Sequence, residues 1–98
     1  MLYLCCYDIV SDRCRTKVAT TLENIGLERI QYSVFVGSLT YAQKRLLLKQ
    51  IKQIIGNEQA HVLLIPFSFP KNKDGLTHIG TSSPDWNYLA KKVNTLIL

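Results

Sequence analysis

An apolar segment opens the chain, Leu2-Tyr3-Leu4-Cys5-Cys6-Tyr7-Asp8-Ile9-Val10, and the polar segment Ser11-Asp12-Arg13-Cys14-Arg15-Thr16-Lys17 follows it. A nearly unbroken apolar run bounded by polar turn residues predicts a strand buried on both faces. The run contains one carboxylate, Asp8, near its C-terminal end. An ionised aspartate is rarely buried without a partner or a metal, because desolvating the charge costs several kcal/mol. Asp8 therefore either lies at the exposed end of the strand, as a turn or cap residue, or binds a cation.

The composition predicts a single globular domain. The 98 residues suffice for one modest core, and 47% hydrophobic with 19% charged residues excludes a disordered chain. The net charge of +5 favours an anionic partner, nucleic acid first, although a basic surface without a partner is common at this charge. No segment approaches the ~20 apolar residues of a membrane span, and no signal peptide is visible. We therefore expect a cytoplasmic protein that makes no membrane contact.

The three cysteines do not form a disulfide framework. Cys5 and Cys6 are neighbours in the predicted strand and point to opposite faces, and Cys14 lies in the next segment. No CxxC spacing or Cys/His cluster indicates zinc. We interpret all three as small apolar residues in a reducing compartment.

Two segments carry the periodicity of amphipathic helices. Ser11 or Asp12 can cap the first, predicted over residues 12–25, and Gly26 supplies its left-handed C-terminal cap. Its apolar stripe recurs at intervals of four, four and three, at Cys14, Val18, Leu22 and Ile25. A capping box of Thr40 and Gln43 begins the second helix, which ends at Gly56. Its core positions are Leu47, Leu48, Ile51, Ile54 and Ile55.

The remaining apolar segments predict strands. Residues 27–37 favour sheet and close at Gly37, and residues 61–67 form another buried strand. His61 is interpreted as solvated or hydrogen-bonded, because no partner lies at ligand spacing. These elements predict one sheet packed against two helices. Beyond a core of residues 1–67 we expect a C-terminal extension over residues 76–98.

The predicted extension comprises a strand at 76–80, a short helix from Ser83-Pro84 to Val93, and an apolar tail at 95–98, after a loop at 70–75. The late strands are surplus to a minimal sheet. A surplus strand can add to the sheet edge of a partner, so we expect a dimer.

Three parts of the sequence, Tyr7-Asp8-Ile9, Arg15 and Gly26-Leu27-Glu28-Arg29-Ile30-Gln31-Tyr32-Ser33-Val34-Phe35-Val36-Gly37, resemble the CRISPR-associated Cas2 family. The resemblance runs over residues 1–80, and its Gln-Tyr-Ser-Val-Phe stretch is highly specific. It implies a ferredoxin-like α+β fold and a homodimer. It also implies a role in spacer acquisition beside the Cas1 integrase, with metal-dependent endonuclease activity on RNA or duplex DNA.

The resemblance also assigns residues. It places the metal ligand at Asp8 and other catalytic positions at Tyr7, Arg15, Arg29 and Phe35. Lys17 departs from the family pattern, which often has arginine there; the charge is kept but bidentate phosphate contact is lost. Arg15 and Arg29 are expected to hold phosphates, whereas Tyr7 or Phe35 would pack beneath a base or line the core. For Phe35 we favour the core.

Magnesium fits these expectations if two chains contribute. The ion takes an octahedral oxygen shell, keeps several waters and needs one or two carboxylates. Two Asp8 side chains facing each other across a twofold axis would supply that pair. Bound metal would then activate a water and neutralise developing charge on the phosphate.

Two classes of function stay open: a magnesium-dependent phosphodiesterase, or a non-catalytic adaptor that holds duplex DNA for the integrase. Backbone contacts to nucleic acid, which are largely independent of base sequence, are expected from eight basic residues. They are Arg13, Arg15, Lys17, Lys44, Arg45, Lys49, Lys71 and Lys73. An unrelated RNA-recognition module is disfavoured, because no RNP-type aromatic motif is present.

Overall fold

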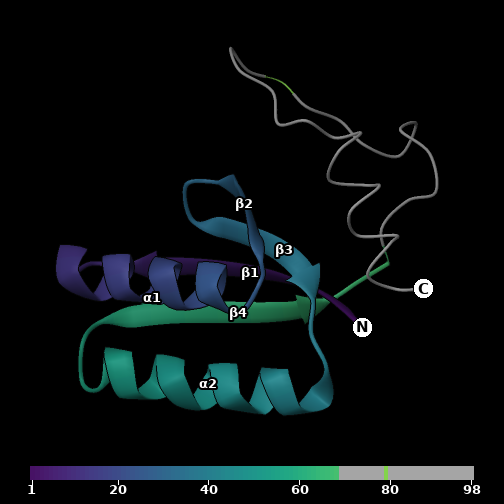
Figure 1. Cartoon of the computed structure of the whole chain (residues 1–98). Helices are drawn as coiled ribbons and strands as arrows, with labels where there is room; N and C mark the ends of the chain where they lie inside the picture. The colour runs from purple at the N-terminus through teal and green to yellow at the C-terminus, as the bar shows by residue number, and fades with distance from the viewer. Residues whose placement is uncertain (69–78, 80–98) are drawn as a thin grey trace.

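The computed structural model describes residues 1–68 and residue 79 and begins with strand β1 (Leu2–Ile9). In chain order there follow α1 (Asp12–Asn24), β2 (Glu28–Gln31), β3 (Val34–Ser38), α2 (Tyr41–Ile55) and β4 (Ala60–Pro66). All strand pairs are antiparallel, and the sheet order is β2-β3-β1-β4 (Figure 1). This order, with β1 inside the sheet and two helices, is the ferredoxin-like α+β sandwich that the sequence predicts.

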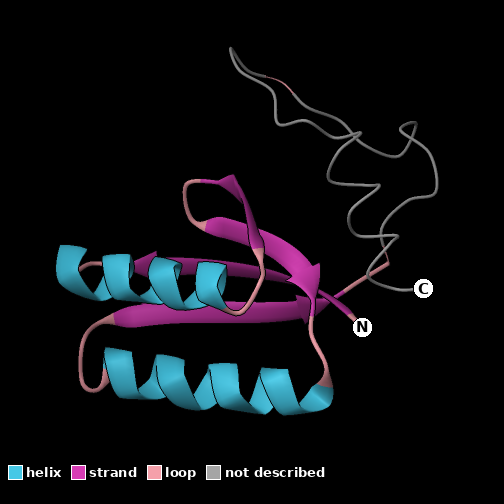
Figure 2. Cartoon of the chain, in the orientation of Figure 1, coloured by secondary structure: helices cyan, strands magenta, loops and turns pink. Residues whose placement is uncertain are grey.

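Both helices cover the same face of the sheet, and the core lies between the two layers (Figure 2). The core is a single cluster of apolar side chains from strands, helices and the segments that join them. Its members are Tyr3, Cys5, Tyr7, Ile9, Cys14, Val18, Ala19, Leu22, Leu27, Phe35, Leu39, Leu47 and Ile51. The predicted stripe of α1 is therefore confirmed at Cys14, Val18 and Leu22, with Ile25 packed against the cluster.

Strand β1 presents different side chains to its two faces. Cys5, Tyr7 and Ile9 face the helices and are buried. On the opposite face Cys6 is half-buried and Asp8 is exposed. The prediction of burial on both faces therefore holds for one face only, because both described helices lie on the same side of an antiparallel sheet. We call the other side the open face.

The helix termini follow the sequence signals. Ser11 is the N-cap of α1 and accepts a hydrogen bond from the Cys14 amide at 3.2 Å. Gly26, with φ of +103°, takes the left-handed conformation after the helix ends. Thr40 and Gln43 form the predicted capping box of α2. These local signals alone determine where the helices begin and end.

The segment predicted as one strand over residues 27–37 is a β-hairpin. Strands β2 and β3 are joined at Tyr32 and Ser33, and the register shifts between Arg29 and Gln31, which marks a β-bulge. The turn contains no glycine, proline, asparagine or aspartate, and Ser33 is its one weak turn signal. Gly37 lies inside β3 and does not close the strand.

The C-terminal predictions at residues 71, 73, 76–80, 84–93 and 95–98 lie outside the described residues, apart from residue 79. All three cysteines are free thiols. Within residues 1–68 no helix has the length and apolar character that crossing a membrane requires.

Gly37 is required by close packing rather than by backbone conformation. A Cβ atom there would lie 2.6 Å from Cδ2 and 3.3 Å from Cα of Leu27, which is itself buried. We expect Gly37→Ala to lower the free energy of unfolding by about 1–3 kcal/mol, measured by urea denaturation. In a Leu27→Ala background the same substitution should cost less, because the clashing methyl group is gone. Equal costs in both backgrounds would contradict this explanation.

Candidate functional site

Asp8 lies on the open face near the end of β1. Its cross-strand neighbour is His61 of β4, and both side chains are exposed. In the described part of the chain, no third histidine, cysteine or acidic residue joins them to make a group that could hold a metal. Residues 1–68 of one chain therefore offer one carboxylate and one imidazole here, which is an incomplete shell for magnesium.

The other four predicted catalytic residues lie together on the side of the sheet that carries the helices. The rings of Tyr7 and Phe35 are stacked, with centroids 6.2 Å apart and planes inclined by 28°. The Arg29 guanidinium lies 5.0 Å from the centroid of the Phe35 ring. Both Arg15, at 6.0 Å, and Arg29, at 5.9 Å, also lie over the ring of Tyr32. We call Tyr7, Arg15, Arg29, Tyr32 and Phe35 the arginine–aromatic cluster.

Tyr7 fixes the turn between β2 and β3. Its hydroxyl donates to the Tyr32 carbonyl at 3.3 Å, and its amide donates to the Ser33 carbonyl at 3.1 Å. Burial raises the pKa of the Tyr7 phenol, and the neighbouring Arg29 offsets only part of that shift. Tyr7 is therefore a neutral hydrogen-bond donor at neutral pH, and its contacts are those of a positioning residue.

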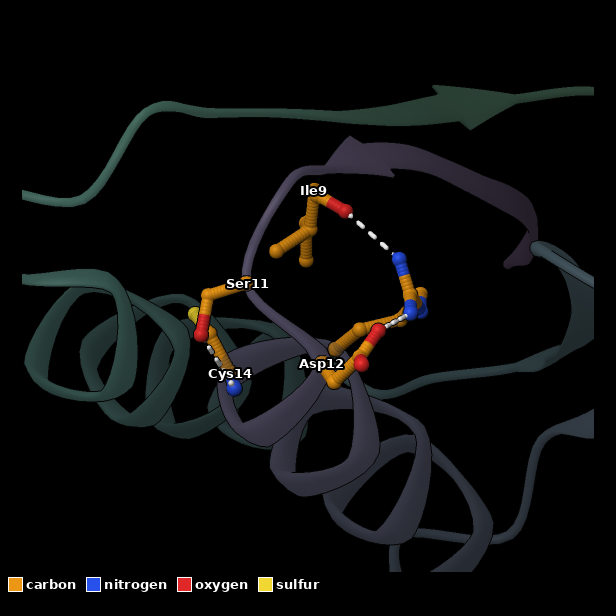
Figure 3. Close-up of polar contacts among 5 residues, drawn as sticks. Ile9, Ser11, Asp12 and Cys14 are labelled. Carbon is orange, nitrogen blue, oxygen red and sulfur yellow. Dashed lines mark hydrogen bonds and ion pairs between the residues drawn. The ribbon is translucent and has the colours of Figure 1, made fainter.

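The two arginines are held by protein groups. Arg15 extends from the first turn of α1, where its Nη1 donates to the Ile9 carbonyl at 3.0 Å and its Nη2 pairs with Asp12 (Figure 3). Arg29 Nη2 lies 3.8 Å from the carboxylate of Glu23. The side chains of Arg15 and Arg29 remain 27% and 41% exposed. Each guanidinium thus keeps N–H donors that can reach a ligand.

Strand alternation separates Asp8 from the cluster. Consecutive residues of a strand point to opposite faces, so Tyr7 enters the core while Asp8 reaches the open face. The five residues predicted to be catalytic therefore form two surfaces in one chain, not one site. Phe35 is fully buried, which confirms the core location favoured for it.

A third surface is basic and lies on the helices. Arg13 and Lys17 of α1 line a groove of about 520 Å³ beside α2, together with Ser11, Cys14, Thr21, Gln50, Gln53, Ile54 and Glu58. Lys44 lies 5.3 Å from the ring of Tyr3, and Arg45 lies 5.8 Å from that of Tyr41. Six of the eight predicted basic residues thus lie on the helices, Arg13, Arg15 and Lys17 on α1 and Lys44, Arg45 and Lys49 on α2, whereas Lys71 and Lys73 lie outside the described residues.

Cys5 and Cys14 are buried in the core and are not candidate nucleophiles. Burial, together with the neighbouring Cys6, raises the pKa of the Cys5 thiol to about 11. Cys14 is buried as well, and its thiol lies 3.8 Å from the Ile54 carbonyl. The candidate chemistry therefore rests on the carboxylate and the arginines.

The sequence interpretation missed Tyr32 and the neighbour of Asp8. Tyr32 belongs to the motif shared with the family, but the sequence predicts a strand there and no turn. It therefore does not predict that the Tyr32 side chain is exposed. His61 was given no partner, because Asp8 lies 53 residues away in the sequence and the two meet only through strand pairing.

The fold and its surfaces place the chain in a class: it is a small ferredoxin-like α+β protein with an exposed carboxylate on its open face and arginines on the side of the helices. Residues 1–74 match the family model described as CRISPR associated protein Cas2. The chain therefore belongs to the Cas2 family.

Curated relatives agree with this assignment. The chain is 38% identical over 66 residues to "CRISPR-associated endoribonuclease Cas2" of Desulforudis audaxviator, a match that covers 67% of this chain and 62% of that protein. It is 36% identical over 66 residues to "CRISPR-associated endoribonuclease Cas2 1" of Archaeoglobus fulgidus, covering 67% and 70%. The match thus spans less than two thirds of the first relative's length.

Solved structures share the fold. A hypothetical protein, TT1823, from Thermus thermophilus superposes with a TM-score of 0.68 and 28% identity, over 85% of this chain and 93% of that one. Streptococcus pyogenes Cas2 superposes with a TM-score of 0.61 over 82% and 100% of the chains. At 22% identity, the second comparison bears on the fold alone.

Proposed function

We propose that this Cas2 chain is a metal-dependent endonuclease that acts in CRISPR adaptation as a homodimer beside the Cas1 integrase. The observation that carries the proposal is Asp8, an exposed carboxylate near the end of a central strand, on a sheet face that no described helix covers. The endoribonuclease names of the curated relatives support the reaction class. A cytoplasmic location is supported by the three free thiols.

The open face supports the homodimer. Leu63 and Ile65 of β4 are 58% and 44% exposed, and they pair across the strands with Cys6 and Leu4, which are only half-buried. Exposed apolar side chains gathered on one sheet face favour burial against another apolar surface. A second copy of the chain would offer the same surface, as a twofold interface requires. Ile79 is also 93% exposed.

Dimerisation would complete the metal site. Magnesium takes oxygen ligands and keeps several waters, so two Asp8 carboxylates from two chains suffice as protein ligands. Bound there, the ion would lower the pKa of a water and offset charge on the phosphate. Asp8 would hold and orient the ion. His61, at the neighbouring position, offers a nitrogen rather than an oxygen and would not be needed to hold the magnesium.

The first test concerns the metal ligand. Asp8→Asn removes the charge but keeps the size of the side chain, so we expect magnesium-dependent cleavage of RNA and duplex DNA to fall at least 100-fold, comparable to the loss of a major charge-stabilising group (roughly 10²–10³). His61→Asn is the matched control, because it changes the paired position without removing an oxygen ligand. It should retain most of the activity. Full activity of Asp8→Asn would rule out the assignment.

The second test concerns the interface. Leu63→Lys places a charge on the open face, so we expect sedimentation to show a shift from dimer to monomer and cleavage to be lost with it. Leu46→Lys introduces the same charge at a comparably exposed leucine of α2, 52% exposed, and should leave the dimer intact. A dimer that survives Leu63→Lys would place the interface elsewhere.

A second function, an adaptor for duplex DNA, is favoured by the basic helix layer. Arg13, Lys17, Lys44 and Arg45 lie on the helices, on the opposite side of the sheet from the open face. A dimer joined through its open faces would therefore expose both basic layers. Contacts of this kind bind phosphates without reading base sequence, and they suit a protein that holds DNA for another enzyme.

The third test measures that binding. Replacing Lys44 and Arg45 together by glutamine should weaken binding equally on unrelated duplexes. It should also reduce the slope of log affinity against log salt by about one unit per lost phosphate contact. Asp8→Asn serves as the control, because it alters charge on the open face and should leave the slope unchanged. If the slope is the same in all three proteins, the duplex lies on another surface.

A further inference from the structure

We propose that Tyr32, flanked by Arg15 and Arg29, is a stacking site for the base of an unpaired nucleotide. The inference rests on the proposed function in one respect, since it takes nucleic acid to be the ligand. It adds a binding residue and its place: an unpaired base, in a single strand or at the end of a duplex, would stack at the tip of the β2–β3 hairpin.

The exposure of Tyr32 is the first observation. Tyr32 is 70% exposed at the tip of the β2–β3 hairpin, whereas Tyr7 and Phe35 of the same cluster are buried. The guanidinium groups of Arg15 and Arg29 lie 6.0 and 5.9 Å from the ring centroid. The side chain therefore contributes little to the core, and two positive groups lie about 6 Å from the centroid of a largely exposed ring.

The second observation is that the backbone of the turn and both guanidinium groups are held in place before any ligand binds. Tyr7 donates hydrogen bonds to the carbonyls of Tyr32 and Ser33, and so holds the turn. The Ile9 carbonyl and Asp12 hold Arg15.

Arg29 is fixed in the same way. It lies 5.0 Å from the buried Phe35 ring, with Glu23 at 3.8 Å. Ordering flexible side chains on binding costs free energy, and much of that cost is met here by folding.

An unpaired nucleotide matches this chemistry better than a duplex does. A base stacked on an aromatic ring gains affinity whatever its identity, and arginine adds stacking and cation–π contributions. In a closed duplex both faces of each internal base are already covered by neighbouring bases. The free N–H donors of the two arginines would hold the adjoining phosphate. Sequence-tolerant binding of single strands follows from these contacts.

Tyr41 provides a natural comparison. It is 75% exposed, and the guanidinium of Arg45, one helical turn further on, lies 5.8 Å from its ring. Only one arginine lies over this ring, and the pair is the usual contact between residues four apart on a helix surface. Tyr41 thus matches Tyr32 in residue type and exposure but lacks the second guanidinium and the buried support.

The test uses the full-length protein at low salt, with two probes: a single-stranded oligonucleotide containing 2-aminopurine, and a blunt duplex. We expect Tyr32→Leu to weaken single-strand binding by about 5- to 100-fold, the range for losing one stacked base. Quenching of 2-aminopurine should be lost as well. Tyr32→Phe, which keeps the ring, should bind as the wild type does. Duplex affinity and the salt dependence should stay unchanged in both variants, because no charge is removed.

Tyr41→Leu is the matched control and should leave both probes unaffected. The inference is overturned if Tyr32→Leu binds the single strand normally. It is also overturned if Tyr32→Leu weakens duplex binding equally, or if Tyr41→Leu produces the same loss.

The outcome is separable from that of the nuclease. A wild-type protein that cleaves nothing but shows Tyr32-dependent binding would refute the nuclease and support the stacking site. Normal cleavage by the wild type, together with unchanged single-strand binding by Tyr32→Leu, would support the nuclease and refute the stacking site. Failure of the wild type to bind either probe would refute both.

Discussion

The two-sided alternation of β1 is the constraint on which the rest of the structure depends. Because β1 pairs with β3 on one side and β4 on the other, its side chains can point only toward the helices or toward the open face. Tyr7 therefore enters the core, and its neighbour Asp8 must leave it. Two consecutive residues of β1 therefore belong to different surfaces: Tyr7 lies in the packed core, and Asp8 lies on the open face.

The packed side explains why the residues of the arginine–aromatic cluster belong together. Tyr7 joins the buried Phe35 ring to the hairpin turn, and Arg29 extends from that ring to the exposed Tyr32. Removing any of the buried members would shift the turn, and so would affect whatever binds at the tip. Residues of this kind influence function by positioning others, even where they make no contact with a substrate.

The open side has the opposite character. It offers apolar side chains of β4 beside one carboxylate. Within residues 1–68 the apolar side chains stay exposed, and no further group completes a metal site at the carboxylate. A second copy would remedy both deficits at once. The helix layer, which carries the basic residues, lies on the far side of the sheet and remains free for nucleic acid in such an arrangement.

The sequence alone determined the features that depend on neighbouring residues: the caps at Ser11 and Thr40, the stripe of α1, and the exceptional position of Asp8 in an apolar strand. It also supported the family resemblance, because that motif is contiguous. Only the tertiary structure decided that residues 27–37 form a hairpin, since Ser33 is a weak turn signal within a run that favours sheet, and strand pairing supplies the stabilisation. It likewise decided that His61 lies opposite Asp8 and that two arginines lie near the ring of Tyr32, because contacts between distant segments follow from strand order and register, which local periodicity does not encode.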